Sequence, residues 1–172
     1  MYRANMLRIV LLILGVASLG QGARSDATSE ARKAIQAAYD KSDAATAKKD
    51  IDGAMAFQTS DYTYTTQKGR KLDNATVRTS TTQVLTLARE IHGKTVIRKI
   101  ALKGSMATVT VDETGSIVVA TPQRPDQVSK IVIEARSEDV WIKTPKGWRE
   151  KSSRELSSKQ SVNGKPVAAP TP

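Results

Sequence analysis

Hydrophobic positions near the start of the mature chain recur with the period of an α-helix. From residue 31, apolar side chains fall at intervals of three and four, at Ala31, Ala34, Ile35, Ala38 and Tyr39. This spacing places them along one side of a helix, and the alanine-rich surroundings favour that conformation. The pattern therefore predicts a first helix over residues 29–48.

A short second helix is predicted directly after the first. Asp50 is a residue type that caps the free N–H groups at a helix start. The three apolar residues that would form the buried side of this helix are Ile51, Ala54 and Met55, and Phe57 would end it.

A third helix is predicted after a hairpin. Residues 61–65, DYTYT, alternate aromatic and β-branched side chains, which is typical of a strand. A turn at 67–69 would let residues 70–72 pair back. Asp73 or Asn74 would then cap a helix whose apolar positions are Val77, Val84, Leu85, Ala88 and Ile91. Gly93 stands where a C-terminal cap is expected.

The period changes to two after Gly93. Alternating segments at 95–102, 106–120, 128–142 and 148–160 are separated by Gly- and Pro-containing turns. Long strands with such short connections predict an antiparallel meander. Residues 161–172 are polar with prolines and predict a disordered tail.

The order of elements predicts an α+β fold, with three helices packed on a strongly curved antiparallel sheet. Both tryptophans, Trp141 and Trp148, lie within the hairpin DVWIKTPKGWR, although the chain has only four Tyr and one Phe besides. Residues this close to a turn can face each other across the hairpin, so we expect the indoles to close one end of the sheet.

The first residues predict a secretory signal peptide over 1–23. Arg3 and Arg8 precede the apolar run IVLLILGVASLG, and small residues follow. The run is shorter than the roughly 20 residues of a membrane-spanning helix, although an uncleaved anchor is the alternative. We therefore expect a secreted or periplasmic bacterial protein with its domain at 24–160 and no stable membrane span after cleavage.

Composition narrows the function classes. The chain has no cysteine, so neither a lipid anchor on cysteine nor a disulfide supports the domain. Its formal net charge is +10, but the basic residues are scattered in short groups. Nucleic acid is not expected as a partner of an exported chain with few aromatic residues. Two explanations agree with this charge: attraction to an anionic envelope polymer, or a basic surface that is simply solvated.

Four segments resemble the nuclear transport factor 2-like superfamily, which includes SnoaL-like cyclases and ketosteroid isomerases. They are ARKAIQAAYDKSDAATAKKDIDGAMAFQTSDYTYT, KGRKLDNATVRTSTTQVL, VTVDETGSIVVA and DVWIKTPKGWREKSSREL. The resemblance covers about 30–160 and implies a cone-shaped, cystatin-like fold whose mouth can hold a small molecule. The isomerase branch carries an acidic base near the end of its first hairpin, where this chain has Thr65 and Thr66, which argues against isomerase chemistry.

The candidate ligand-binding residues are polar side chains on predicted strands and on the first helix. They are Tyr39, Tyr62, Tyr64, Glu134, Arg136 and Arg154. The strand period puts Tyr62 with Tyr64, Glu134 with Arg136, and Ser152 with Arg154 and Trp148, each set on one face. Two arginines on a concave face could bind a carboxylate or phosphate; on the outer face they would form surface ion pairs.

Three functions remain open from the sequence. The first is a non-catalytic domain that binds a small ligand or an envelope protein, with a homodimer across the open sheet face. The second is a SnoaL-like acid–base enzyme using Tyr62, Arg136 or His92, the only histidine. The third is an anionic polymer binder. No metal or cofactor is expected, because one His without Cys is a poor ligand set.

Overall fold

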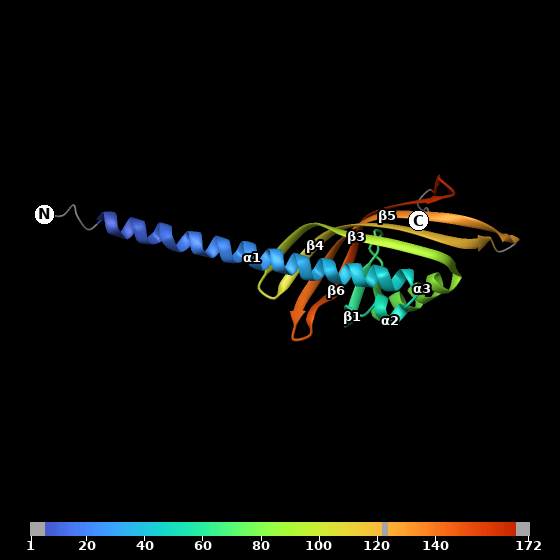
Figure 1. The fold of residues 1–172 in the computed structure, drawn as a ribbon, viewed down its shortest axis with the longest axis horizontal. Coiled ribbons are helices and arrows are strands. Elements are labelled where there is room, and N and C mark those ends of the chain that lie inside the picture. The colour runs from blue at the N-terminus through green and yellow to red at the C-terminus, as the bar shows by residue number, and fades with distance from the viewer. Residues whose placement is uncertain (1–5, 122–123, 168–172) are drawn as a thin grey trace.

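A long helix lies along a curved sheet, with two shorter helices at one end of the molecule (Figure 1). The computed structural model describes residues 6–121 and 124–167, with side chains from 25 to 120 and from 127 to 167. Its helices are α1 (Met6–Ala47), α2 (Ile51–Ala54) and α3 (Asn74–Leu87). Its strands are β1 (Gln58–Thr65), β2 (Lys71–Asp73), β3 (Ala88–Lys103), β4 (Met106–Thr121), β5 (Arg124–Thr144), β6 (Gly147–Val162) and β7 (Lys165–Val167).

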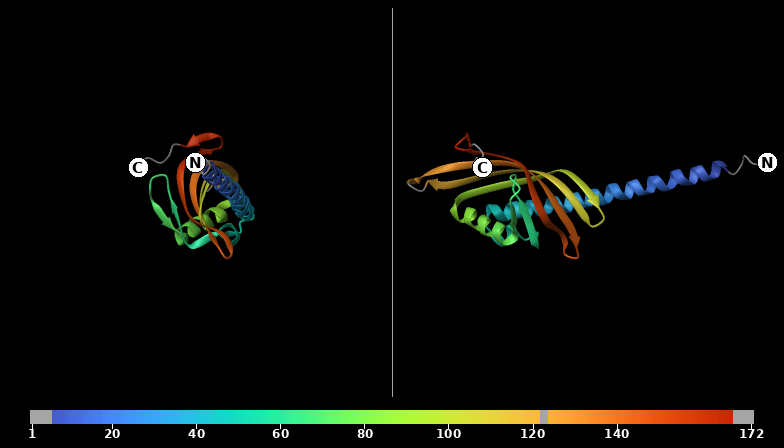
Figure 2. Two further views of the ribbon diagram at one scale, coloured as in Figure 1. Left: turned by 90° about the vertical axis from the view of Figure 1, so that its left-hand side faces the viewer. Right: turned by 180° about the vertical axis from the view of Figure 1, so that it is seen from behind.

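The strands form one sheet in the order β2-β1-β6-β5-β4-β3, with β7 paired to β6. Consecutive strands from β3 to β6 pair antiparallel, as predicted. The junction of β1 with β6 is parallel, however, so the sheet is mixed and not wholly antiparallel. The sheet curls around α1, and the face that α1 covers is called the inner face below (Figure 2). The predicted α+β architecture is confirmed.

Aspartates begin the two short helices. The carboxylate of Asp50 accepts a hydrogen bond of 3.0 Å from the backbone N–H of Gly53 at the start of α2. That of Asp73 accepts one of 2.8 Å from Thr76 at the start of α3. Both helices therefore begin where their capping residues predicted.

The end of the third helix was predicted wrongly. Helix α3 stops at Leu87, and Gly93 lies inside β3 opposite Gly115. A bulge between Ala88 and Glu90 adds one residue to the strand, so Ala88 and Ile91 point to the same side although they are three apart. A bulged strand thus imitates the spacing of a helix.

The main core lies between α1 and the inner face. Ile35, Ala38 and Tyr39 pack against a set of buried residues from β3, β4 and β5: Ile97, Ala107, Val109, Val111 and Trp141. Ala31 is also buried, whereas Ala34 is exposed, so the helix stripe is narrower than predicted. A second cluster of Leu85, Ala88 and Ile91 closes the space near α3.

The tryptophans belong to one cluster but do not pair directly. Trp141 lies opposite Glu150, and Trp148 lies opposite Lys143. Trp141 is 1% exposed, and Trp148 packs, partly buried, against the same core. The hairpin therefore contributes both indoles to one side of the sheet, as expected, in a staggered arrangement.

The C-terminal segment is more ordered than predicted. Residues 161–167, predicted to belong to a disordered tail, complete β6 and form β7 across a turn in which Asn163 and Gly164 have φ of 51° and 77°. Residues 168–172 lie outside the described part.

Residues 6–23, most of the predicted signal peptide, continue α1 as helix, and residues 1–5 are not described. No described helix meets the length and hydropathy of a membrane span.

Candidate functional site

Polar side chains stand on the inner face in the middle of β5. Ser137, Asp139 and Trp141 alternate inward and are 3%, 3% and 1% exposed. An aspartate in the centre of a strand is disfavoured by strand propensity, and a buried one needs hydrogen-bond partners. Its surroundings therefore define the candidate site, called here the interior: the side chains enclosed between α1, β1 and the inner face of β4, β5 and β6.

A hydrogen-bonded chain of three side chains holds Asp139. The indole Nε1 of Trp141 donates a bond of 2.9 Å to the hydroxyl oxygen of Tyr39, and that hydroxyl donates to Oδ2 of Asp139. The rings of Tyr39 and Trp141 meet edge to face, with centroids 5.1 Å apart and planes at 77°. Packing and hydrogen bonds together fix the position of this carboxylate.

The second oxygen of Asp139, Oδ1, is buried and has no hydrogen-bond partner among the described residues. Burial raises the pKa of Asp139 to about 7, against the lowering effect of the Tyr39 hydroxyl. Ser153 faces Asp139 across the strands and also lowers this pKa, but it lies outside good hydrogen-bond geometry to Oδ1. The group is thus poised to gain or lose a proton near neutral pH.

Two further carboxylates share the interior. Burial raises the pKa of Glu113, whose Oε1 accepts a bond of 2.6 Å from the hydroxyl of Ser137. Burial, and then the charges of Asp139 and Glu113, raise the pKa of Glu150 well above its usual range. Glu150 as a whole residue is partly exposed, so the shift reflects the surroundings of its carboxylate. The three acids disfavour one another's ionisation.

Tyrosines line the same space from β1. Tyr62 is 4% exposed, and burial raises the pKa of its phenol above the usual value. Tyr64 is half-buried and donates a bond of 2.9 Å to Oε2 of Glu155 on β6. Both phenols stay protonated at neutral pH and act as hydrogen-bond donors.

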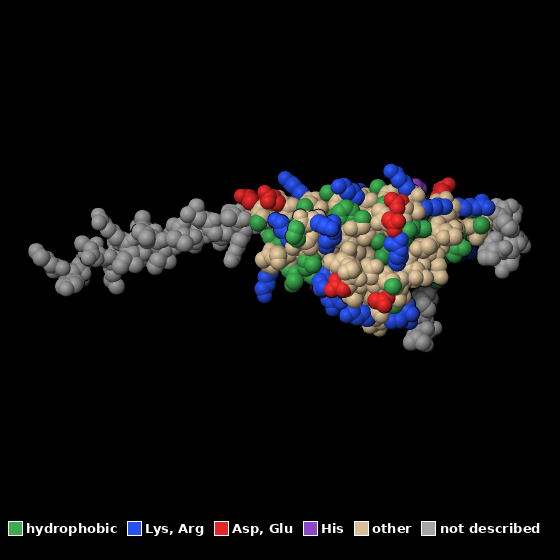
Figure 3. Space-filling view, turned by 90° about the horizontal axis from the view of Figure 1, so that it is seen from below, with side chains coloured by type: hydrophobic (Ala, Val, Ile, Leu, Met, Phe, Trp, Pro, Cys, Tyr) green, Lys and Arg blue, Asp and Glu red, His purple; other side chains and the backbone are tan. Residues whose placement is uncertain are grey.

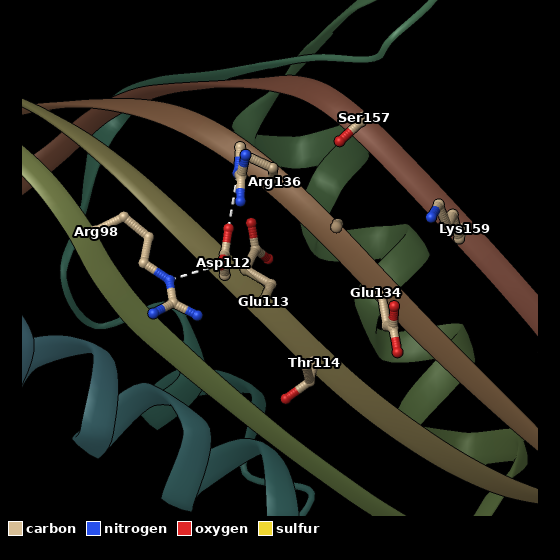
Figure 4. A pocket seen from close by; sticks show the side chains of 9 residues that line it. Arg98, Asp112, Glu113, Thr114, Glu134, Arg136, Ser157 and Lys159 are labelled. Carbon is tan, nitrogen blue, oxygen red and sulfur yellow. Dashed lines mark hydrogen bonds and ion pairs between the residues drawn. The ribbon is translucent and has the colours of Figure 1, made fainter.

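The three tyrosines predicted as ligand-binding residues therefore all lie on the inner side of the sheet. The predicted charged residues do not join them, because Glu134, Arg136 and Arg154 lie on the opposite, outer face of the sheet. Figure 4 shows Glu134 and Arg136 on this face. Strand alternation was correct in grouping Glu134 with Arg136, but these exposed charges remain in water because burial would cost their hydration. This part of the predicted site is corrected.

One predicted face assignment fails because of a bulge. Ser152, Arg154 and Trp148 were predicted to share one face of the sheet. Ser152 and Arg154 do share the outer face, but Trp148 points inward. Lys151 is an extra residue in β6 between the pairs Val140–Ser152 and Trp141–Glu150. An extra residue reverses the alternation beyond it.

Ion pairs occupy the outer face. Asp112 accepts from Arg98 at 2.6 Å and from Arg136 at 2.7 Å, while Arg154 donates to Glu138 at 2.8 Å. Arg98, Asp112 and Arg136 border a shallow groove of about 350 Å³ shown in Figure 4. On the side of the molecule shown in Figure 3, the described Lys and Arg side chains are spread out, with acids between some of them. These pairs are exposed and contribute little to stability.

His92 was predicted at a helix end and lies instead in β3, opposite Ser116. Its side chain is exposed and borders another shallow groove on the outer face with Lys94 and Lys130. His92 and Arg136 lie on the outer face, whereas Tyr62 is buried on the inner side. The three residues named for the acid–base alternative are therefore not brought together. No group of metal-ligating residues is found among the described residues.

The interior acids Glu113, Asp139 and Glu150 were not among the predicted site residues. A signal for them is present in the sequence, since each is a carboxylate within a predicted strand and Asp139 alternates with Trp141 in the tryptophan hairpin. The opposite faces of a strand look alike in sequence when both carry polar residues, so the signal was not decisive.

Comparison with known proteins supplies similarity in structure only. No protein-family profile matches the sequence, and no curated protein matches it. Similar solved structures include a nuclear transport factor 2-like superfamily protein from Salmonella enterica, at 15% identity and TM-score 0.57, covering 83% of this chain and 96% of that one. A cystatin-like domain of unknown function from Nostoc punctiforme has 14% identity and TM-score 0.56, covering 74% and 77%.

A third similar structure is a hexachlorocyclohexane dehydrochlorinase of type 2, at 13% identity and TM-score 0.59, covering 80% of this chain and 89% of that one. Proteins with different roles thus share the architecture. At such identities the likeness establishes the fold and leaves the reaction to be argued from the site.

Proposed function

We propose that this chain, which has the nuclear transport factor 2-like, cystatin-like fold, binds a small organic molecule in its interior without transforming it. Asp139 would be the main anchor for a hydrogen-bond donor of the ligand, with Tyr62 and Tyr64 as donors to its acceptors. The predicted signal peptide supports a role outside the cytoplasm, in the periplasm or after secretion. An envelope protein is the alternative partner, and a homodimer across the open sheet face stays a prediction.

The observation that carries the proposal is the state of Asp139. One oxygen is held by Tyr39, and the other is buried without a partner. A buried polar atom without a partner costs free energy that a ligand hydrogen bond would recover. Binding is preferred to catalysis as the proposed function for the following reason. Burial above all raises the pKa values of the Tyr62 and Tyr64 phenols, so these groups act as hydrogen-bond donors and not as bases.

A fragment screen tests the proposal. Saturation-transfer NMR on the full chain would identify small polar molecules that bind, and Asp139→Asn is expected to weaken those hits about tenfold or more. Glu138→Gln is the matched control, because Glu138 is the next residue on β5 and points outward to Arg154. Hits that bind the Asp139→Asn variant as well as the original chain would refute an interior site.

A second candidate function is acid–base catalysis. The pKa of Asp139, about 7, allows the group to accept and return a proton near neutral pH, and one similar structure is a dehydrochlorinase. In this case Asp139 would take a proton from an acidic C–H bond of the ligand and return one from water. Deuterium exchange into small ketones in D₂O, followed by NMR, would detect it, and exchange that persists in Asp139→Asn would exclude Asp139 as the base.

A further inference from the structure

The interior is acidic although the chain as a whole is basic. The formal net charge of the chain is +10, yet the ionisable side chains around Asp139 on the neighbouring strands are Glu113 and Glu150, with Glu155 beside Tyr64. Acidic side chains are therefore gathered inside a chain whose net charge is positive.

The interior acids are not among the carboxylates found in ion pairs between described residues. The ion pairs among described residues join Asp52, Asp61, Asp112 and Glu138 to arginines or lysines, and these acids have side chains that are 24–82% exposed. Within the described part, Glu113, Asp139 and Glu150 take part in none of them. An ionised Asp139 therefore has no cationic partner in these ion pairs, and the cationic group of a ligand could supply one.

Geometry also suits an ammonium group. Oδ1 of Asp139 is buried without a donor, and an ammonium group supplies N–H donors and positive charge together. The rings of Tyr39 and Trp141 lie next to the acid, and Tyr62 is near enough for Asp139 to raise its pKa. Aromatic rings attract cations through their faces.

We infer that the interior ligand is a small organic cation, a protonated amine, whose ammonium group donates a hydrogen bond to Oδ1 of Asp139 and pairs with the ionised form of that carboxylate. This inference rests on the proposed function and deepens it by naming the ligand class. Neutral or anionic molecules of the same shape lack the charge and would bind more weakly.

A dependence on pH follows from the arrangement. The amine binds the ionised form of Asp139, so binding lowers the pKa of that group and releases protons. The groups that face Asp139 from β4, β6, α1 and β1 are Glu113, Glu150, Tyr39 and Tyr62, and none of them is a base that would reverse the sign. Affinity should rise as pH increases through about 7.

Three probes of one shape test the inference: benzylamine, benzyl alcohol and benzoate. Each is titrated into the full chain at pH 7.5, and the indole N–H cross-peak of Trp141 is followed by NMR, because that group donates to Tyr39 next to Asp139. Trp148, near the turn, is the internal reference. We expect benzylamine to bind at least about tenfold more tightly than benzyl alcohol, and benzoate not to bind.

Two comparisons complete the experiment. Benzylamine affinity should fall severalfold from pH 7.5 to 5.5 in the original chain. This comparison does not depend on whether any variant folds. Asp139→Asn should lose the preference for the amine, while Glu138→Gln keeps it. Equal or tighter binding of benzyl alcohol or benzoate at Trp141 would overturn the cation inference and leave the proposed binding function standing. If none of the three probes shifts the Trp141 signal, the cation inference falls, and failure of the broader fragment screen would then remove the binding function as well.

Discussion

The hydroxyl of Tyr39 on α1 donates a hydrogen bond to Oδ2 of Asp139 on β5, a hundred residues later in the chain. The same hydroxyl accepts from Trp141, so one phenol joins the first helix to the centre of the sheet. This contact positions the interior acid and fastens α1 to the inner face at the same time.

Replacing Tyr39 with Phe should destabilise the fold. The change leaves the buried N–H of Trp141 without an acceptor and removes the donor to Asp139, so we expect the free energy of unfolding to fall by about 2–4 kcal/mol at pH 7.5 in urea denaturation. Tyr64→Phe is the control, since Tyr64 is half-buried and near the rim, with an expected loss of about 1 kcal/mol or less. Equal losses in the two variants would contradict the role given to Tyr39.

The free energy of unfolding should decrease as pH rises from about 4 to 8. Asp139 has a pKa of about 7 in the folded state and an ordinary value near 3.9 when unfolded, so the folded state holds a proton that the unfolded state has lost. The stabilisation that this proton gives to the folded state is fully present below about pH 4 and is lost as pH rises through 7. It amounts to at most about 4 kcal/mol. The raised pKa values of Glu113 and Glu150 act in the same direction.

Asp139→Asn should flatten this dependence in urea melts between pH 4 and 8. Asp112→Asn is the control: Arg136 and Arg98 lower the pKa of Asp112, so its effect lies below about pH 4. A slope that is the same in the original chain and in Asp139→Asn would show that another group titrates.

Gln36 should protect the edge of the sheet. Strand β3 is the last strand on its side, and the Gln36 amide donates to the carbonyl of Thr95 at 2.8 Å and accepts from the N–H of Ile97 at 3.0 Å. Gln36→Ala exposes both groups, so we expect a loss of about 1–3 kcal/mol and faster amide exchange at Ile97. Light scattering should show aggregation that increases with concentration, whereas Lys33→Ala, at an exposed position of α1, should leave both properties unchanged.

Deleting Lys151 should be far more harmful than replacing it. Lys151 is the extra residue of the β6 bulge, and its side chain makes one exposed ion pair with Asp61 at 2.5 Å. Lys151→Ala should cost no more than about 1 kcal/mol. The deletion would turn either Trp148 and Glu150 or Ser153 and Glu155 to the wrong face, with an expected loss above about 3 kcal/mol by thermal or urea melts. A mild effect of the deletion would mean that the bulge does not set the faces.

Local patterns were sufficient for much of the fold. The spacing around Ile35 located the core side of α1, and Asp50 and Asp73 located two helix starts, because periodicity and capping depend on neighbours in the chain. The pattern failed where a bulge changed the period, at Ala88 and at Lys151. It also missed the hairpin turn at Asn163 and Gly164, although Asn-Gly is a strong turn signal.

The sequence by itself determined which residues of a strand act together: Tyr62 with Tyr64, and Glu134 with Arg136. Only the tertiary structure decided that the first pair faces the interior and the second faces water, because alternation has two faces and the burial of one of them depends on which side α1 covers. For the same reason the meeting of Tyr39 with Asp139 could not be read locally. An acid in a strand acquires its raised pKa from the residues that the folded sheet and helix place around it.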